Sequence, residues 1–132
     1  MVKPVRLQLS RKKGFRLQEL SRKTNGLLAV NVSRPGKFGN PFRIHRTQHG
    51  TWEVRVPLGK YPYPFDTYRR NYGTRDLAIA DAILAHKRWL RSPAGCEIAQ
   101  LARETFKDHN AACWCKGPCH GDNLLACARG NR

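Results

Sequence analysis

A cluster of thiol and imidazole side chains lies near the C-terminus of the chain. Three of the five cysteines and one histidine fall within eight positions, at Cys113, Cys115, Cys119 and His120. Thiolate and imidazole groups bind soft metal ions, and they also act as nucleophile and proton carrier in catalysis. This density is typical of a site and not of core packing, but it leaves the kind of site open.

Three kinds of chemistry fit these residues. A tetrahedral zinc site would use the metal ligands Cys113, Cys115, Cys119 and His120, although ligation by two adjacent residues is geometrically awkward. A catalytic site would use Cys119 or Cys115 as nucleophile or general acid, with His120 or Asp122 carrying the proton. A redox pair would join Cys115 to Cys119. The sequence does not choose among zinc, catalysis and redox chemistry.

A second unusual loop, residues 33–42, follows a nearly continuous apolar run at 27–32. Its glycines would let backbone amides approach a ligand, its cations would attract phosphate, and its asparagine offers a donor and an acceptor. The residues that a ligand would meet there are Arg34, Lys37, Gly39 and Asn40. A tight turn packed by Phe38 and Phe42 explains the same residues equally well.

The apolar periodicity predicts the elements that must position these loops. Strands are expected at 5–9, 27–32 and 110–115, a β-hairpin at 43–57, and helices at 75–91 with Thr74 as N-cap, 95–106 and 120–129. The alternation of strands and crossover helices predicts an α/β protein, a small Rossmann-like three-layer unit with the hairpin as an insertion.

Several local expectations follow from these elements. The apolar run at 27–32 is typical of a central strand covered on both faces. Cys113 and Cys115 would point to one face of the last strand. A thiol at the start of the last helix, as Cys119 would be, should have a lowered pKa because unpaired amides favour the thiolate. If 27–32 and 110–115 are parallel neighbours, both loops lie at the same edge of the sheet.

Length and charge limit the classes of function. A chain of 132 residues is expected to be a single domain, 1–132, with the basic segment 1–26 packed on its body. The net charge of +16 is uneven, at +7 in 1–33, +7 in 34–75 and +2 in 76–132. Such a field attracts phosphate backbones. Because no long apolar segment is present, we expect no membrane partner and a cytoplasmic protein with free or metal-bound cysteines.

The chain resembles a family catalogued as domain of unknown function 4326, which is common in bacteriophages and their hosts. The resemblance rests on three ordered motifs, namely Val5-Arg6-Leu7-Gln8 with Lys13-Gly14-Phe15-Arg16, Val32-Ser33-Arg34-Pro35 with Gly39-Asn40-Pro41-Phe42, and Ala112-Cys113-Trp114-Cys115 with Pro118-Cys119-His120-Gly121-Asp122. It implies a compact Rossmann-like fold in which the arginine arm and both loops gather at one pocket.

Charge and resemblance together give a leading hypothesis and two alternatives. The protein is expected to bind nucleic acid or a nucleotide through its basic face and the cysteine pocket. The expected binding residues are Arg6, Gln8, Arg11, Arg16, Arg34, Lys37, Gly39, Asn40 and Phe42. The first alternative is an enzyme that cleaves or modifies a nucleotide or nucleobase with the Cys119 and His120 pair. The second is a protein that binds and inhibits a host enzyme. The sequence does not fix the oligomeric state.

Overall fold

The structure is a computed structural model that describes residues 2–55 and 69–130. The chain divides into two compact units, and each is described by itself. The first unit joins the two ends of the chain, residues 1–39 and 97–132, and the second comprises residues 40–96. The expectation of one domain over 1–132 stays a prediction.

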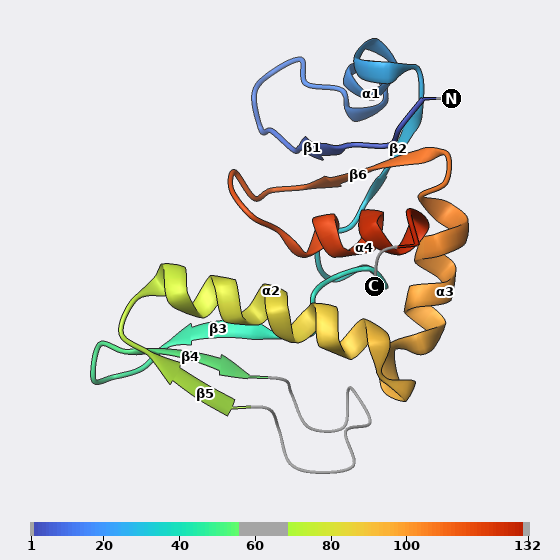
Figure 1. Ribbon diagram of the computed structural model, residues 1–132. Coiled ribbons are helices and arrows are strands. Elements are labelled where there is room, and N and C mark those ends of the chain that lie inside the picture. Colours follow the sequence, from blue (N-terminus) through green and yellow to red (C-terminus); the bar gives the residue numbers. More distant parts are fainter. Residues whose placement is uncertain (1, 56–68, 131–132) are drawn as a thin grey trace. The chain divides into compact units, whose positions relative to one another are not determined.

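The first unit is built on a parallel sheet of three strands (Figure 1). Their order is β1 (Arg6–Gln8), β6 (His109–Cys113) and β2 (Leu28–Asn31). The prediction that 27–32 and 110–115 form parallel neighbours is confirmed, with Leu28 opposite His109. The prediction that 27–32 forms the central strand is wrong. Among the described strands β6 is central and β2 lies at the edge, and Leu28 of β2 is exposed.

Helices cover both faces of this sheet. They are α1 (Leu17–Asn25) on one face and α4 (His120–Ala128) on the other, while α3 (Cys96–Thr105) precedes β6 in the chain. On one face Leu7, Ala29 and Ala112 form an apolar cluster against which Leu17 of α1 packs. Because successive strand residues point to opposite faces, the neighbours of Leu7 and Ala112 face the other side, where α4 runs beneath β6 in Figure 1. Three layers result, and they place the start of α4 beside the end of β6.

A buried asparagine joins the sheet to α1. Asn110 is fully buried in β6, and its Oδ1 accepts hydrogen bonds from the backbone N–H of Val5 at 2.8 Å and from Nδ2 of Asn25 at 2.9 Å. Its Nδ2 donates to Oγ of Ser21 at 2.8 Å. Buried hydrogen-bond donors and acceptors must be paired. The side chain of Asn110 pairs both its own oxygen and nitrogen and the polar groups of Val5, Asn25 and Ser21 that face them. The network fixes how α1 and the first strand sit on β6.

The second unit is an antiparallel sheet with one long helix. The strands β3 (Arg43–Arg46), β4 (Trp52–Arg55) and β5 (Arg69–Tyr72) lie in that order, followed by α2 (Arg75–Arg91) and the short 3-10 helix η1 (Pro93–Gly95). The Thr74 hydroxyl accepts from the backbone N–H of Leu77 and caps α2, as predicted. The hairpin is confirmed up to Arg55, while residues 56 and 57 lie outside the described part. The strand β5 was not predicted.

The prediction of a small α/β protein is confirmed. Four α-helices and two three-stranded sheets occur in the described residues, and one of the sheets is parallel. No helix in the described part of the chain is long and apolar enough to cross a membrane.

A candidate thiol site

Three sulfur atoms converge where β6 ends and α4 begins. Cys113 is the last residue of β6, Cys119 is the N-cap of α4, and Cys115 lies in the loop between them. We call residues 113–119 the thiol loop. The three Sγ atoms all lie within 4.8 Å of one another, and those of Cys113 and Cys119 are 2.8 Å apart. Cys113 and Cys119 are each 1% exposed, and Cys115 is exposed.

The convergence has a different origin from the one predicted. Cys113 and Cys115 do not share one face of a strand, because β6 ends at Cys113. The chain turns after Trp114, and this turn brings Cys115 back toward the sulfur of Cys113. The thiol site is therefore a property of the loop conformation, and the residues that hold the loop decide whether the site forms.

Arg6 of β1 holds the thiol loop in this conformation. Its Nη1 donates to the carbonyl of Cys115 at 3.0 Å and its Nη2 to the carbonyl of Gly117 at 2.7 Å. Its Nε donates to Oδ1 of Asp122 at 3.1 Å, and Nη1 also lies 3.5 Å from Sγ of Cys113. A guanidinium presents its donors as a rigid fork, which suits several acceptors in fixed positions. Arg6, expected to bind nucleic acid, is a positioning residue of the thiol loop.

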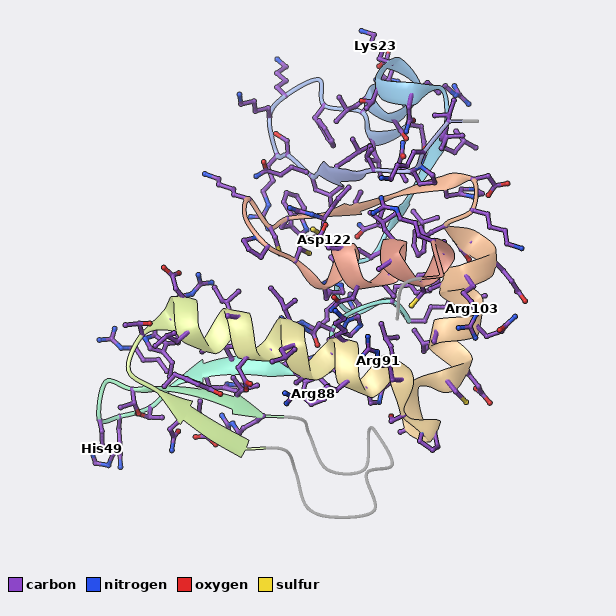
Figure 2. All side chains as sticks on the ribbon, in the orientation of Figure 1. Lys23, His49, Arg88, Arg91, Arg103 and Asp122 are labelled. Atoms are coloured by element: carbon purple, nitrogen blue, oxygen red, sulfur yellow. The ribbon has the colours of Figure 1, made fainter. Side chains whose placement is uncertain are left out.

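The first turn of α4 is closed by a reciprocal cap. Sγ of Cys119 accepts from the backbone N–H of Gly121 at 3.4 Å, and Oδ2 of Asp122 accepts from the backbone N–H of Cys119 at 3.2 Å. Figure 2 labels Asp122 in this first turn. A Cβ on Gly121 would lie 3.3 Å from Cδ of Arg6 and 3.5 Å from Cγ2 of Val32. The glycine thus lets α4 approach β1 closely.

His120 lies beside Cys119 with its tautomer fixed. Its Nε2 is 2.8 Å from the backbone carbonyl of Val32, which can only accept, so Nε2 carries the hydrogen. Its Nδ1 faces Sγ of Cys119 at 3.5 Å. Burial lowers the pKa of His120, and the positive charge of Arg34 acts in the same direction. With the hydrogen on Nε2, the neutral form of the ring turns the lone pair of Nδ1 toward Sγ of Cys119.

A hydrogen bond between Cys113 and Cys119 shifts the pKa values of these two thiols in opposite directions. A hydrogen bond from Cys119 lowers the pKa of Cys113 to about 5 despite burial, with help from the backbone of Cys115 and from Arg6. The same hydrogen bond raises the pKa of Cys119, and burial adds to this effect. The prediction of a lowered pKa for Cys119 is wrong, because donation to Cys113 outweighs the amide of Gly121. Burial also raises the pKa of Cys115.

The loop after β2 is built by turns and packing. We call residues 33–39 the glycine loop. The backbone N–H of Gly36 donates to the carbonyl of Ser33 at 3.2 Å, and that of Gly39 donates to the carbonyl of Gly36 at 2.9 Å. A Cβ on Gly39 would lie 2.7 Å from Cγ of Arg34. The close approach to Arg34 accounts for Gly39 without a ligand.

The cations expected to bind nucleic acid lie at the surface of the first unit. Arg34 and Lys37 are exposed on the glycine loop, and Arg16 is exposed just before α1. The uncharged Gln8, also an expected binding residue, is exposed at the end of β1. Arg11 is also exposed, and its guanidinium lies 5.0 Å from the centre of the Trp114 ring.

Trp114 was not among the predicted site residues, although its indole is 46% exposed at the tip of the thiol loop. A tryptophan between two cysteines that turn inward has to point outward. The Cys-Trp-Cys spacing could therefore have predicted an exposed Trp114, once the cysteines on either side of it were assigned to one site.

Two expected binding residues belong to the second unit. Nδ2 of Asn40 donates to the carbonyl of Ala82 at 3.2 Å, and its Oδ1 accepts from the backbone N–H of Phe42 at 2.9 Å. Both Asn40 and Phe42 are buried. Asn40 thus stabilises the fold of its own unit. The gathering of these two residues with the thiol loop stays a prediction.

The fold and the site define a small α/β protein with a cluster of thiols at the carboxyl edge of its parallel sheet. The chain belongs to the family described as Domain of unknown function (DUF4326), which matches residues 8–130. The resemblance seen in the sequence motifs is confirmed. No curated protein matches the chain, and no solved structure does.

Proposed function

We propose that the chain binds nucleic acid, above all single strands, at the carboxyl edge of its parallel sheet. The observation that carries this proposal is the charge of the loops after β1, β2 and β6. Residues 9–16 contain four cations, 33–39 contain two and 114–119 contain one, and none of these segments contains Asp or Glu. We call these three segments the basic edge. Ligands of open α/β sheets bind at this edge of the strands.

The strand pairing brings the three segments of the basic edge together. The backbone N–H of Leu9 donates to the carbonyl of Cys113 at 2.8 Å, so the first and third segments start side by side. The backbone N–H of Val32 donates to the carbonyl of Ala112 at 2.8 Å, so the second segment starts beside the third. A phosphate backbone that follows this edge would meet cations from all three segments.

Trp114 supports the preference for single strands. Its exposed ring can stack on an unpaired base, and Arg11 beside it can neutralise a phosphate or stack in turn. Stacking of one base on an aromatic side chain contributes about 1–3 kcal/mol and tolerates any sequence. Bases in a duplex are already stacked, so this contribution would be lost there.

The burial of Cys119 and His120 favours binding over catalysis by Cys119. Cys119 is 1% exposed and His120 is 8% exposed, and both side chains have partners within the first unit. A nucleophile has to reach its substrate, while a residue that holds a loop does not. We infer that the cysteine and histidine pair shapes the loop that presents Trp114.

We also place this binding in the cytoplasm, which for a phage-borne gene is that of the host. The five cysteines are free in the described residues. Thiols persist in the reducing cytosol, whereas disulfides form in oxidising compartments. A basic protein there meets nucleic acid as its most abundant polyanion.

Fluorescence anisotropy with labelled single-stranded DNA, single-stranded RNA and a duplex of the same sequence tests the proposal. A Lys12→Ala, Lys13→Ala double variant removes two cations of the basic edge. The matched control is Lys87→Ala, Arg88→Ala, which removes the same charge from α2, where Figure 2 places Arg88. Each phosphate contact to a single strand contributes about 0.7 to the slope of log affinity against log salt. The first variant should therefore lower the slope by about 1.4, and the control should leave it unchanged.

Two results would count against nucleic-acid binding at this edge. Equal affinity for polyphosphate and for the single strands would reduce the interaction to non-specific charge attraction. Equal losses in the two double variants would show that total charge, and not the basic edge, determines the binding.

A further inference from the structure

We propose that Cys113, Cys115 and Cys119 bind one zinc ion through their three thiolates. This inference concerns a second ligand and does not depend on nucleic-acid binding. The three Sγ atoms lie within 4.8 Å of one another, although the residues come from a strand end, a loop and a helix start. Thiols that only fill a core have no reason to point at a common centre.

The spacing of the sulfurs suits a tetrahedral ion after a small adjustment. Zinc–sulfur bonds of about 2.3 Å place tetrahedral ligands about 3.8 Å apart. The present separations lie on both sides of this value, from 2.8 Å between Cys113 and Cys119 up to the limit of 4.8 Å for the set. An ion would push the two buried sulfurs apart by about 1 Å, while the exposed Cys115 closes over it.

The surroundings of the sulfurs suit thiolates. The backbone N–H of Gly121 donates to Sγ of Cys119 at 3.4 Å, and Nη1 of Arg6 approaches Sγ of Cys113 at 3.5 Å. Hydrogen bonds to metal ligands from an outer layer of residues orient those ligands and tune the metal. Zinc with three thiolates carries one net negative charge, and the guanidinium of Arg6, which also pairs with Asp122, lies beside it. Each thiol that binds gives up its proton to solvent.

The fourth position of this site is left to water or to a bound ligand. Among the described residues, the cluster of possible metal ligands here consists of these three cysteines. Nδ1 of His120 contacts Cys119, and Nε2 is held by the carbonyl of Val32. Asp122 already accepts from Arg6 and from the backbone of Cys119. Zinc sites with three protein ligands keep such a position open.

Zinc is the ion that this set of ligands favours. Thiolates select zinc, copper(I) and iron–sulfur clusters over hard cations. Zinc has no redox chemistry and takes tetrahedral sulfur sites without further components. The same preference makes cobalt(II) a useful spectroscopic replacement, because thiolate ligation gives it an intense charge-transfer absorption.

The test uses the full chain, purified under reducing conditions and freed of metal. Zinc is titrated against a chromophoric chelator, and cobalt(II) absorption reports sulfur ligation. We expect one zinc per chain. Because loss of an outer-layer partner alone weakens metal sites about 10–100-fold, Cys115→Ser should weaken binding at least 100-fold. Cys96→Ser, an exposed cysteine on α3, is the matched control and should bind as the wild type does. His120→Gln should retain one zinc.

Circular dichroism of each variant separates loss of ligands from loss of fold, and Cys115→Ser is the decisive variant because its side chain is the exposed one. Wild type that binds zinc no more tightly than Cys115→Ser would overturn the site. Cobalt(II) without thiolate absorption would do the same. Loss of zinc in His120→Gln with the fold intact would overturn the open fourth position.

Discussion

The thiol loop and the glycine loop follow neighbouring strands of one parallel sheet, and they are held in opposite ways. In the thiol loop, side chains from three elements converge, and a single guanidinium from β1 binds two of its carbonyls. The glycine loop is held by short backbone turns and by the close approach of Gly39 to Arg34. Phe38 anchors the glycine loop, because its ring packs against that of Phe106 with the two ring centres 5.2 Å apart.

This difference shows that packing explains the unusual sequence of the glycine loop, whereas chemistry explains that of the thiol loop. Gly39 and Asn40 resembled ligand-binding groups in the sequence, but each has a structural use within its own unit. The thiols have partners too, yet they also contact one another, and apolar packing does not require contacts between thiols. We therefore treat the thiol loop as a site and the glycine loop as a scaffold with a cationic surface.

The largest expected effect is that of Arg6→Gln on the thiol loop. Hydrogen bonds to charged groups contribute about 1.5–3 kcal/mol each, and partial exposure of the Arg6 side chain reduces their sum. We expect a loss of about 2–3 kcal/mol in the free energy of unfolding, measured by urea denaturation, with little rescue by Arg6→Lys because an ammonium lacks the planar fork. Arg11→Gln should leave stability unchanged. An Arg6→Gln variant as stable as the wild type would remove Arg6 as the residue that holds the loop.

Gly39→Ala should break the glycine loop while sparing the thiol site. The new Cβ would lie 2.7 Å from Cγ of Arg34 and 3.1 Å from the carbonyl oxygen of Gly36. Overpacking of this kind costs about 1–3 kcal/mol, which thermal or urea denaturation would detect. Gly36→Ala is the matched control, because its Cβ would meet only the carbonyl of Ser33 at 3.4 Å. Equal stability of the two variants would contradict the packing account.

Asp122→Ala should have an intermediate effect on the thiol loop. The carboxylate accepts from the backbone N–H of Cys119 and from Nε of Arg6, but its side chain is 52% exposed. Loss of a helix-capping side chain typically costs about 1 kcal/mol. Asp122→Asn should recover part of this loss, because an amide oxygen still accepts a hydrogen bond. An Asp122→Ala variant as stable as the wild type would show that the cap contributes nothing.

The smallest effect on stability is expected for Lys37→Ala on the glycine loop. Its ammonium lies 5.9 Å from the Phe38 ring at an exposed position, so the change in the free energy of unfolding should stay within about 0.5 kcal/mol. The salt slope for single strands should nevertheless fall by about 0.7 if Lys37 contacts one phosphate. A loss of stability without a change in the salt slope would show that Lys37 stabilises the fold and does not contact the nucleic acid.

The sequence predicted the elements that have strong local patterns. Thr74 marks a long helix because a hydroxyl before a charged first turn is a common N-cap, and the alternation around Val54 marks a strand. The helix α1 escaped prediction because Arg16 provides no side-chain cap. Gly26, whose positive φ of 82° ends that helix, was a local sign of it, as were Glu19 in its first turn and the cations of its last turn.

The contacts that build the site are distant in sequence, and local patterns could not predict them. Arg6 and Cys115 are 109 positions apart, and Asn110 bonds to Ser21 across 89 positions. Arg6 resembled a nucleic-acid contact because an arginine on a basic arm has no local partner. Its role follows only once β1 is known to pair with β6. The thiols could be predicted as a group because all three lie within seven positions.

Photo-crosslinking tests the central claim most directly. A single-stranded oligonucleotide that contains 4-thiothymidine is bound to the full chain and irradiated, and the crosslinked peptides are identified by mass spectrometry. We predict crosslinks within residues 9–16 and 114–119, with Trp114 among them, and fewer crosslinks when unlabelled single strand competes. Crosslinks confined to residues 40–96 would contradict a functional edge beside the thiol loop.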